Sequence, residues 1–294
     1  SVDQQKEIAS YCAQNKILYL CTPWDTNSVD VLEGIGVPAY KVASADLTNW
    51  PLLDYLVCTR KPLILSTGMS TTAEIIKTVE FLNEREASFV LLHCNSTYPA
   101  PIHDINLRWM FGLRDLHPLV GYSGHERGIN VSIAAAALDA CLIERHFTLD
   151  RKMEGPDHAA SLVKEEFAEM VSAIREVEQS LGQNGDRYLS QGEMINRENL
   201  AKSLVAAVDI KSGSILQPEH IKVRSPGQGL SPQLYERLIG VKANRDLKQE
   251  DFFFSSDLED NRLEPRPYKF FRPWGIPIRY HDFSDYQDRV RPDL

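Results

Sequence analysis

The chain has 294 residues, 43% of them hydrophobic, and is long enough for one large domain or a large domain and a small one. Its net charge of −9 and its lack of a basic tract argue against a nucleic-acid surface, and no apolar run approaches the ~20 residues that span a bilayer. Five scattered cysteines are typical of reduced thiols. We therefore expect a cytoplasmic protein that binds neither nucleic acid nor membrane.

Residues 1–182 alternate between apolar, strand-like runs and segments with helical spacing. The predicted strands are 17–22, 39–43, 62–66, 89–94, 119–122 and 141–149. The predicted helices begin with a short one after Asp25 and continue with 51–58, 71–84, 105–113, 128–139 and 164–181. Six strand–helix units of this length are typical of a parallel α/β fold.

Polar residues follow every predicted strand, and this distribution separates a barrel from an open sheet. An open sheet concentrates functional groups at one switch point, whereas a (β/α)₈ barrel brings all its strand ends to one mouth. The chain also has no G-x-G-x-x-G after its first strand. We therefore predict a TIM barrel. Because six units cannot close eight strands, we expect it to lack its first two.

The rest of the chain divides into three parts by composition. Residues 183–199 are polar and are predicted to form a linker. Residues 200–258 form a small β-rich module, with predicted strands at 203–207 and 220–223. Residues 259–294 are rich in proline, aromatic and charged residues, and are either a tail or the start of a further domain.

Two histidines and two acids are grouped around the last predicted strand of the barrel. Glu144 and His146 are two residues apart, so their side chains leave the same face of a strand, and Asp157 follows in the next loop. His125 follows the neighbouring predicted strand, 119–122, and the two imidazoles could share a divalent metal. Substrate oxygens and water would complete the coordination shell of that metal. The alternative for each histidine is a hydrogen-bonded core residue, which is how we interpret His93.

One cation, Lys41, and several small hydroxyls follow the other strands. Hydroxyls beside glycines suit the oxygens of a phosphate or a carboxylate. Any single serine can equally be a turn residue, but six hydroxyls that all follow strands are hard to explain as turns. They are Thr22, Ser44, Ser66, Thr67, Ser96 and Ser123.

Seven ordered motifs closely resemble the sialic acid (N-acetylneuraminate) synthases. They are Thr22-Pro-Trp-Asp25, Lys41-Val-Ala-Ser44, Leu65-Ser-Thr-Gly-Met69, Leu92-His-Cys-Asn-Ser-Thr-Tyr-Pro99, Gly121-Tyr-Ser-Gly-His125, Ile143-Glu-Arg-His-Phe-Thr-Leu-Asp150 and Gly155-Pro-Asp-His158. Lys202-Ser-Leu204 and Arg224-Ser-Pro-Gly-Gln-Gly229 extend the resemblance into the small module, which resembles the family's antifreeze-like (SAF) domain. The resemblance covers roughly residues 1–257.

The resemblance implies an enzyme that condenses phosphoenolpyruvate with an N-acylated amino sugar, such as N-acetylmannosamine, to a nonulosonic acid and phosphate. The implied phosphate ligands are Lys41, Ser44, Ser66 and Ser123. Thr22 and Ser96 would hold the carboxylate of phosphoenolpyruvate, and Tyr98 and Asp157 would contact the acceptor sugar. His125 and His146 would bind Mn²⁺, with Mg²⁺ and Co²⁺ as alternatives, and Glu144 would act beside them as a further catalytic group.

The family also implies a domain-swapped homodimer, in which an SAF arginine contacts the partner's sugar. Arg224 is the candidate here, although it is displaced by one residue from Pro226 relative to the family pattern. The family's first two strands, which carry a glutamate and a lysine, have no counterpart in the chain. We therefore expect an internal fragment of a longer bacterial protein, with an exposed strand edge. The alternative function is a non-catalytic barrel that serves as a ligand-binding or dimerisation scaffold.

Overall fold

The computed structural model describes residues 1–183 and 185–258. The chain divides into two compact units, of which the first is Ser1–Asn184 and the second begins at Gly185. The predicted tail or further domain, 259–294, lies outside the described residues. No helix within the described part combines the length and the apolar character needed to cross a membrane.

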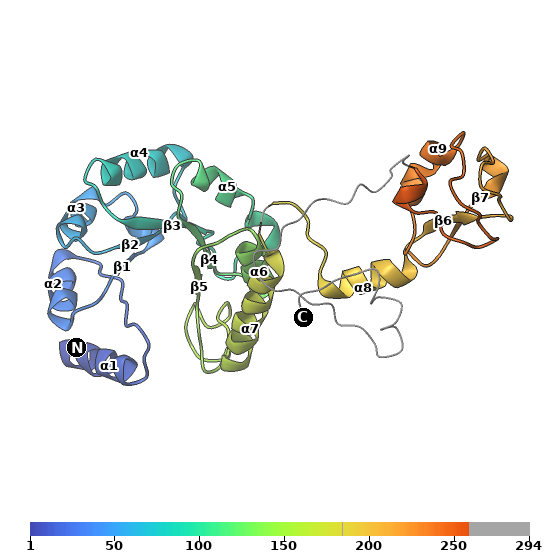
Figure 1. Cartoon of the computed structure of the whole chain (residues 1–294). Coiled ribbons are helices and arrows are strands. Elements are labelled where there is room, and N and C mark those ends of the chain that lie inside the picture. The colour runs from blue at the N-terminus through green and yellow to red at the C-terminus, as the bar shows by residue number, and fades with distance from the viewer. Residues whose placement is uncertain (184, 259–294) are drawn as a thin grey trace, which may run out of the picture. The chain divides into compact units, whose positions relative to one another are not determined.

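The first unit is built on one parallel sheet with the strand order β1-β2-β3-β4-β5. The strands are β1 (Tyr40–Val42), β2 (Leu63–Ser66), β3 (Phe89–Cys94), β4 (Val120–Gly124) and β5 (Ile143–Arg145). Figure 1 shows the helices arranged in an arc along the outer side of this sheet. They are α2 (Thr26–Ile35), α3 (Trp50–Cys58), α4 (Thr72–Asn83), α5 (Trp109–Arg114) and α6 (Asn130–Ala137). This half-barrel confirms the α/β class predicted from the sequence.

Local sequence signals account for where the helices begin and end. Asp25 caps α2, because its carboxylate accepts a hydrogen bond from the Ser28 amide at 2.7 Å, and Gly36 ends the helix in the left-handed conformation. A capping box between Thr71 and Glu74 starts α4. Two further helices, α1 (Val2–Gln14) and α7 (Lys164–Leu181), complete the unit, and α7 has the predicted boundaries.

The core of this unit consists of strand residues packed against the inner faces of the helices. Leu63, Leu65 and Leu91 are fully buried in β2 and β3, as expected for strands covered on both faces. From the helices, Leu53 of α3 and Leu82 of α4 are equally buried. This packing fixes the sheet, and with it the positions of the loops that follow each strand.

The prediction of a first strand at 17–22 is wrong. The segment is not a strand in the structure, and β1, the first strand of the sheet, pairs with β2 alone. Tyr19 and Cys21 pack against the core, whereas Ile17 and Leu18 are exposed. The apolar run that suggested a strand contributes two side chains to the core, but an extended segment becomes a strand only where it finds a backbone partner.

The last strand is shorter than the predicted 141–149. Strand β5 ends at Arg145, and beyond it Phe147 forms an isolated parallel bridge with Leu162. Within the described residues β1 and β5 are the edge strands of this sheet.

The second unit contains the antiparallel pair β6 (Ser203–Ala206) and β7 (Ile221–Arg224), the short helix α9 (Tyr235–Leu238) and its own apolar core. The segment predicted as the linker, 183–199, includes most of helix α8 (Gln191–Leu200). The polar composition of the segment suggested irregular structure. A capping box between Ser190 and Glu193 nevertheless starts a helix there.

His93 is buried in β3, and its Nε2 hydrogen-bonds the Ile105 carbonyl at 2.6 Å, in agreement with its interpretation as a core residue. Burial lowers the pKa of His93 below the ordinary 6.5, so the unfolded chain takes up the proton more readily as the pH falls.

The unaltered protein should therefore lose unfolding free energy between pH 7.5 and 5.5. We expect this loss to be smaller in His93→Gln, as measured by urea denaturation. His103→Gln, at an exposed histidine, is the control, and an unchanged pH dependence in His93→Gln would contradict this account.

Candidate active site

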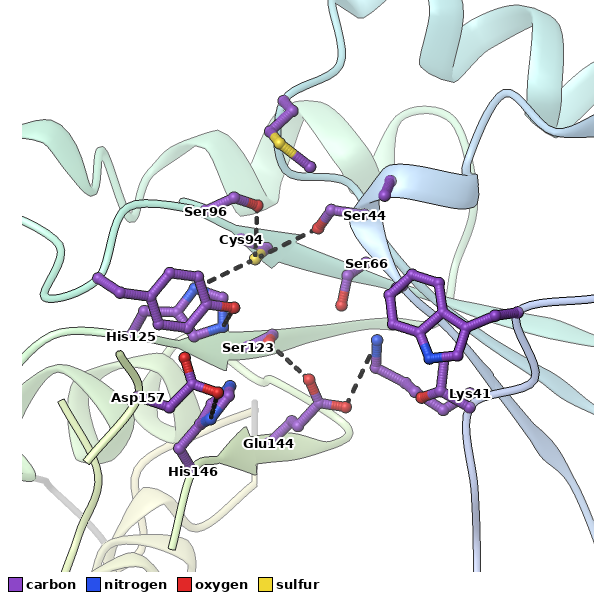
Figure 2. Close-up of a pocket in the computed structure, with 16 residues that line it drawn as sticks. Lys41, Ser44, Ser66, Cys94, Ser96, Ser123, His125, Glu144, His146 and Asp157 are labelled. Atoms are coloured by element: carbon purple, nitrogen blue, oxygen red, sulfur yellow. Dashed lines mark hydrogen bonds and ion pairs between the residues drawn. The ribbon is translucent and has the colours of Figure 1, made fainter. Parts of the chain in front are cut away.

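A cavity of about 510 Å³ lies at the carboxyl ends of the five strands (Figure 2). Most of the site residues predicted from separate strand ends line this one cavity. They are Thr22, Lys41, Ser44, Ser66, Ser96, Tyr98, Ser123, His125, Glu144, His146 and Asp157. The parallel sheet brings them together, because the ends of parallel strands meet at one edge.

Lys41, Glu144 and Ser123 form the first group in the cavity. The Glu144 carboxylate accepts a hydrogen bond from Ser123 Oγ at 2.7 Å, and its other oxygen lies 3.6 Å from Lys41 Nζ. Burial lowers the pKa of Lys41, and the neighbouring Glu144 opposes this shift. Glu144 and the Val42 carbonyl, which accepts from Lys41 Nζ at 2.9 Å, thus compensate in part for the loss of water around the ammonium group.

Ser66 lies near this group, at the end of β2, and is only 2% exposed. Its hydroxyl lines the cavity but has no hydrogen-bond partner among the described residues. A buried hydroxyl without a partner is unfavourable by about 1–3 kcal/mol. It is therefore available to a ligand oxygen that enters the cavity.

Ser44, Cys94 and Ser96 form a second group. The Cys94 thiol lies 3.6 Å from Ser44 Oγ and 3.8 Å from Ser96 Oγ (Figure 2). All three gather over Gly68, where a Cβ would come within 2.8 Å of Ser44 Oγ. A side chain at position 68 would therefore fill the space in which these groups meet.

His125 and Tyr98 begin the third group. His125 Nδ1 lies 2.6 Å from the Asn95 carbonyl, which can only accept, so this nitrogen carries the proton. Its Nε2 then accepts a hydrogen bond from Tyr98 Oη at 2.9 Å. Burial lowers the pKa of His125 and raises that of Tyr98 to about 12, so the imidazole is neutral and the phenol protonated at neutral pH.

His146 faces His125 across the cavity. The two ring centroids are 5.1 Å apart, with an angle of 74° between the rings. His146 Nδ1 lies 3.7 Å from an Asp157 oxygen. Burial, together with the neighbouring His125, lowers the pKa of His146, so both imidazoles are neutral and able to donate a lone pair.

His125 and His146 fit a divalent metal whose coordination shell is completed by substrate oxygens. His125 has the tautomer of a metal ligand, because Nδ1 donates to a carbonyl and Nε2 carries the lone pair. Tyr98 Oη donates to this lone pair in the structure, so a metal bound at Nε2 would replace that hydrogen bond. No group of three or more histidine, cysteine or acidic side chains in the described part of the chain is arranged to hold a metal alone. Two imidazoles would therefore need further oxygens from the substrate or water.

Directly behind the cavity wall lies a buried ion pair that the sequence analysis did not identify. Arg145 Nη1 donates to Glu126 Oε1 at 2.9 Å, and both side chains are fully buried. The other Glu126 oxygen accepts a hydrogen bond from Tyr122 at 2.7 Å. Alternation along β5 points Arg145 away from the cavity that Glu144 and His146 line.

Thr67 lies outside the cavity, Arg224 belongs to the second unit, and Cys94 lines the cavity without having been predicted to do so. Thr67, one of the six expected hydroxyls, does not line the cavity, because its hydroxyl bonds the Leu92 carbonyl at 3.0 Å. Arg224 ends β7 in the second unit and has an exposed side chain. Cys94 lines the cavity, whereas the sequence analysis assigned the cysteines only as reduced thiols and gave Cys94 no place in the site. Its place between His93 and Asn95 at a strand end was the available signal.

The aromatic and apolar side chains at the mouth were also missed. Trp24 and Met69 line the cavity and are largely exposed. Both belong to motifs that the sequence analysis quoted, but neither carries a charge or a hydroxyl that would have marked it.

Comparisons with known proteins agree with this architecture. A sequence model of the NeuB family matches residues 1–186, and one of the SAF domain matches residues 201–259. The chain is 40% identical over 250 residues to the N,N'-diacetyllegionaminic acid synthase of Campylobacter jejuni, covering 84% of this chain and 75% of that protein. It is 36% identical over 265 residues to human N-acetylneuraminate-9-phosphate synthase, and the match covers 89% of this chain and 73% of that protein.

A solved structure supports the same likeness. The N-acetylneuraminic acid synthetase of Leptospira borgpetersenii, in complex with citrate, superposes with a TM-score of 0.63 at 30% identity. The match covers 68% of this chain and 71% of that one.

The two serines of the first group should respond differently to removal of the hydroxyl. We expect Ser66→Ala to raise the free energy of unfolding, by up to about 1–3 kcal/mol, because the removed hydroxyl has no partner among the described residues. Ser123→Ala should lose about 1 kcal/mol, because its hydroxyl bonds Glu144. Urea denaturation of both variants measures this difference, and an equal loss in the two would refute it.

Proposed function

Because the chain belongs to the NeuB family, we propose that it condenses phosphoenolpyruvate with an N-acylated amino sugar to a nonulosonic acid and phosphate. The observation that carries the proposal is the cavity itself. A largely buried cation, a buried hydroxyl without a partner among the described residues and two neutral imidazoles converge there from separate strands. The relatives' names support a synthase of this class, but they name different products.

Phosphoenolpyruvate would bind with its phosphate at Lys41 and the hydroxyls of Ser44, Ser66 and Ser123. The support is the largely buried ammonium group and the Ser66 hydroxyl, which has no partner in the described part of the chain; together they offer a charge and a donor in a partly desolvated place. Thr22 and Ser96 line the same cavity and would hold the carboxylate.

The sugar would occupy the side of the cavity that holds the imidazoles. Tyr98 and Asp157 would hydrogen-bond its hydroxyl and amide groups; the support is that Tyr98 stacks on His125 and that Asp157 lies 3.7 Å from His146. These two histidines would hold the cation, for which we propose Mn²⁺, or Mg²⁺ or Co²⁺. When bound, such an ion polarises the sugar aldehyde as a Lewis acid.

The reaction then requires one new carbon–carbon bond and one broken carbon–oxygen bond. C3 of phosphoenolpyruvate bonds to the aldehyde carbon, and the aldehyde oxygen takes up a proton to become a hydroxyl. Water adds to C2 and gives up one proton, which leaves a hydroxyl and the phosphate on the same carbon. The C2–O bond to the phosphate then breaks as the hydroxyl passes its proton to the departing phosphate, which releases inorganic phosphate and the keto acid. The part played by the chain is to orient both substrates and to hold charge where it develops.

Glu144 is the candidate base for the added water. In the structure it contacts both Lys41 and Ser123, which are the groups proposed to hold the phosphate. A substrate phosphate that accepts hydrogen bonds from Lys41 and Ser123 would displace the Glu144 carboxylate from both groups. The displaced carboxylate would then lie next to C2 of phosphoenolpyruvate. A carboxylate at that position can accept the proton of the attacking water.

The metal assignment can be tested by removing one imidazole. We expect His146→Ala to lose metal-dependent phosphate release by at least about 100-fold, because one of two proposed protein ligands is gone. The assay follows phosphate in the presence of Mn²⁺, phosphoenolpyruvate and a panel of amino sugars. The panel contains N-acetylmannosamine, its 6-phosphate and a 2,4-diacetamido-trideoxy hexose, and so also identifies the acceptor.

His103→Ala is the matched control, since this histidine is exposed and does not line the cavity. It should keep the rate of the unaltered protein. Equal rates in both variants would overturn the ligand assignment. Absence of release from the unaltered protein with every sugar would favour the scaffold function instead.

We also propose the domain-swapped homodimer, with Arg224 of one copy contacting the sugar held by the other. The support is the exposed side chain of Arg224 at the end of β7. A mixture of two inactive variants, His146→Ala and Arg224→Ala, tests it. In a mixed dimer with swapped domains, one of the two sites combines an intact cavity with an intact arginine.

We therefore expect co-expression of the two variants to restore phosphate release to at least a tenth of the unaltered rate. Each variant expressed alone should stay inactive. No restoration in a purified mixed dimer would contradict a site built from two copies. An active Arg224→Ala homodimer would remove this residue from the site.

A further inference from the structure

The two imidazoles stand just beyond the part of the sheet that ties their strands together. The ladder between β4 and β5 consists of Tyr122↔Ile143, Ser123↔Glu144 and Gly124↔Arg145. His125 and His146 each follow the last paired residue of their strand. Backbone pairing between the two strands therefore ends one residue before the groups whose separation matters most for a shared ligand.

Other contacts hold each histidine to a different neighbour rather than to the other. His125 bonds the Asn95 carbonyl through Nδ1, and its own carbonyl accepts from the Ala100 amide at 3.1 Å. The His146 carbonyl accepts from the Leu162 amide at 2.9 Å. These bonds lead to β3 and its loop on one side and to the segment before α7 on the other.

The buried ion pair joins the residues next to the two histidines. Glu126 follows His125 directly, and Arg145 precedes His146 directly. The Arg145 guanidinium donates to the Glu126 carboxylate at 2.9 Å and also to the Glu126 backbone carbonyl at 2.5 Å. It therefore holds both the side chain and the backbone of Glu126, one peptide bond away from the His125 imidazole.

The same guanidinium is fixed from a third direction. Its Nη1 donates to the Gly128 carbonyl at 2.8 Å and to Ser132 Oγ at 2.9 Å, at the start of α6. The planar guanidinium reaches its acceptors from two nitrogens, Nη1 and Nη2, whereas the single nitrogen of an ammonium group cannot occupy both positions.

Gly124 shows how closely this network is packed. A Cβ at this position would lie 2.8 Å from the Glu126 carboxylate and 3.0 Å from Arg145 Cδ. The network thus fills the space beside the last ladder pair, and no side chain can be added there without moving it.

We propose that the Arg145–Glu126 pair is a positioning clamp that sets the separation of the His125 and His146 imidazoles. Both residues are positioning residues, because neither lines the cavity. The consequence for metal binding rests on the proposed function, whereas the clamp itself is a property of the protein without metal. A merely structural ion pair would stabilise the fold without affecting the two rings in particular.

Arg145→Lys tests the clamp, because it keeps the charge and removes the fork. In the metal-free full chain with ¹³C-labelled histidine, the rings at 5.1 Å should show a cross-ring nuclear Overhauser effect, and the variant should lose it. Its affinity for Mn²⁺, measured by electron paramagnetic resonance, should fall at least about 10-fold. Its affinity for phosphoenolpyruvate without metal should stay within about twofold.

Leu82→Ala is the matched control, since Leu82 is fully buried in α4, away from β4 and β5, and its loss lowers stability without touching the clamp. It should keep the cross-ring signal and the Mn²⁺ affinity. Gly124→Ala is a second variant, which keeps both Arg145 and Glu126 but displaces them through the added Cβ. Like Arg145→Lys, it should lose the cross-ring signal and bind Mn²⁺ more weakly.

Retention of the cross-ring signal in Arg145→Lys, or an equal loss in Leu82→Ala, would overturn the clamp. Failure of the unaltered protein to bind Mn²⁺ would instead remove the proposed metal. The ring-to-ring signal would still decide the clamp in that case.

Discussion

The parallel hydrogen-bond ladder from β1 to β5 is the constraint on which the candidate site depends. Each strand contributes few residues, but the in-register pairing brings five carboxyl ends to one edge. Residues as far apart in the chain as Lys41 and Glu144 thereby come within 3.6 Å. The buried leucines of β2 and β3 keep the ladder in place, because a shift by one residue would exchange core and cavity side chains.

Strand β5 shows how alternation separates two environments within three residues. Glu144 and His146 face a cavity that admits a ligand, whereas Arg145 between them is fully buried with its partner Glu126. A buried charge is tolerated only when it is paired and hydrogen-bonded, and Arg145 meets this condition through four oxygen acceptors. The chemistry on one face of the strand is thus supported by electrostatics on the other.

The cavity combines groups whose pKa values burial shifts in complementary ways. Desolvation lowers the pKa of Lys41, His125 and His146 and raises that of Tyr98. Neutral imidazoles suit metal binding, and a protonated phenol suits hydrogen bonding to a sugar. Within residues 1–183 and 185–258, the buried Ser66 hydroxyl has no hydrogen-bond partner, which is typical of a group that bonds a ligand.

The sequence by itself determined the alternation of strands and helices, most element boundaries and the residues that gather at one mouth. Period-2 and period-3.6 patterns, caps and glycines are local signals, and the position of polar residues after strands is readable without coordinates. Only the tertiary structure decided that 17–22 is not a strand, because a strand needs backbone hydrogen bonds to a segment that is distant in the sequence. It also revealed the Arg145–Glu126 pair and the place of Cys94, because burial and contact arise only when separate segments pack together.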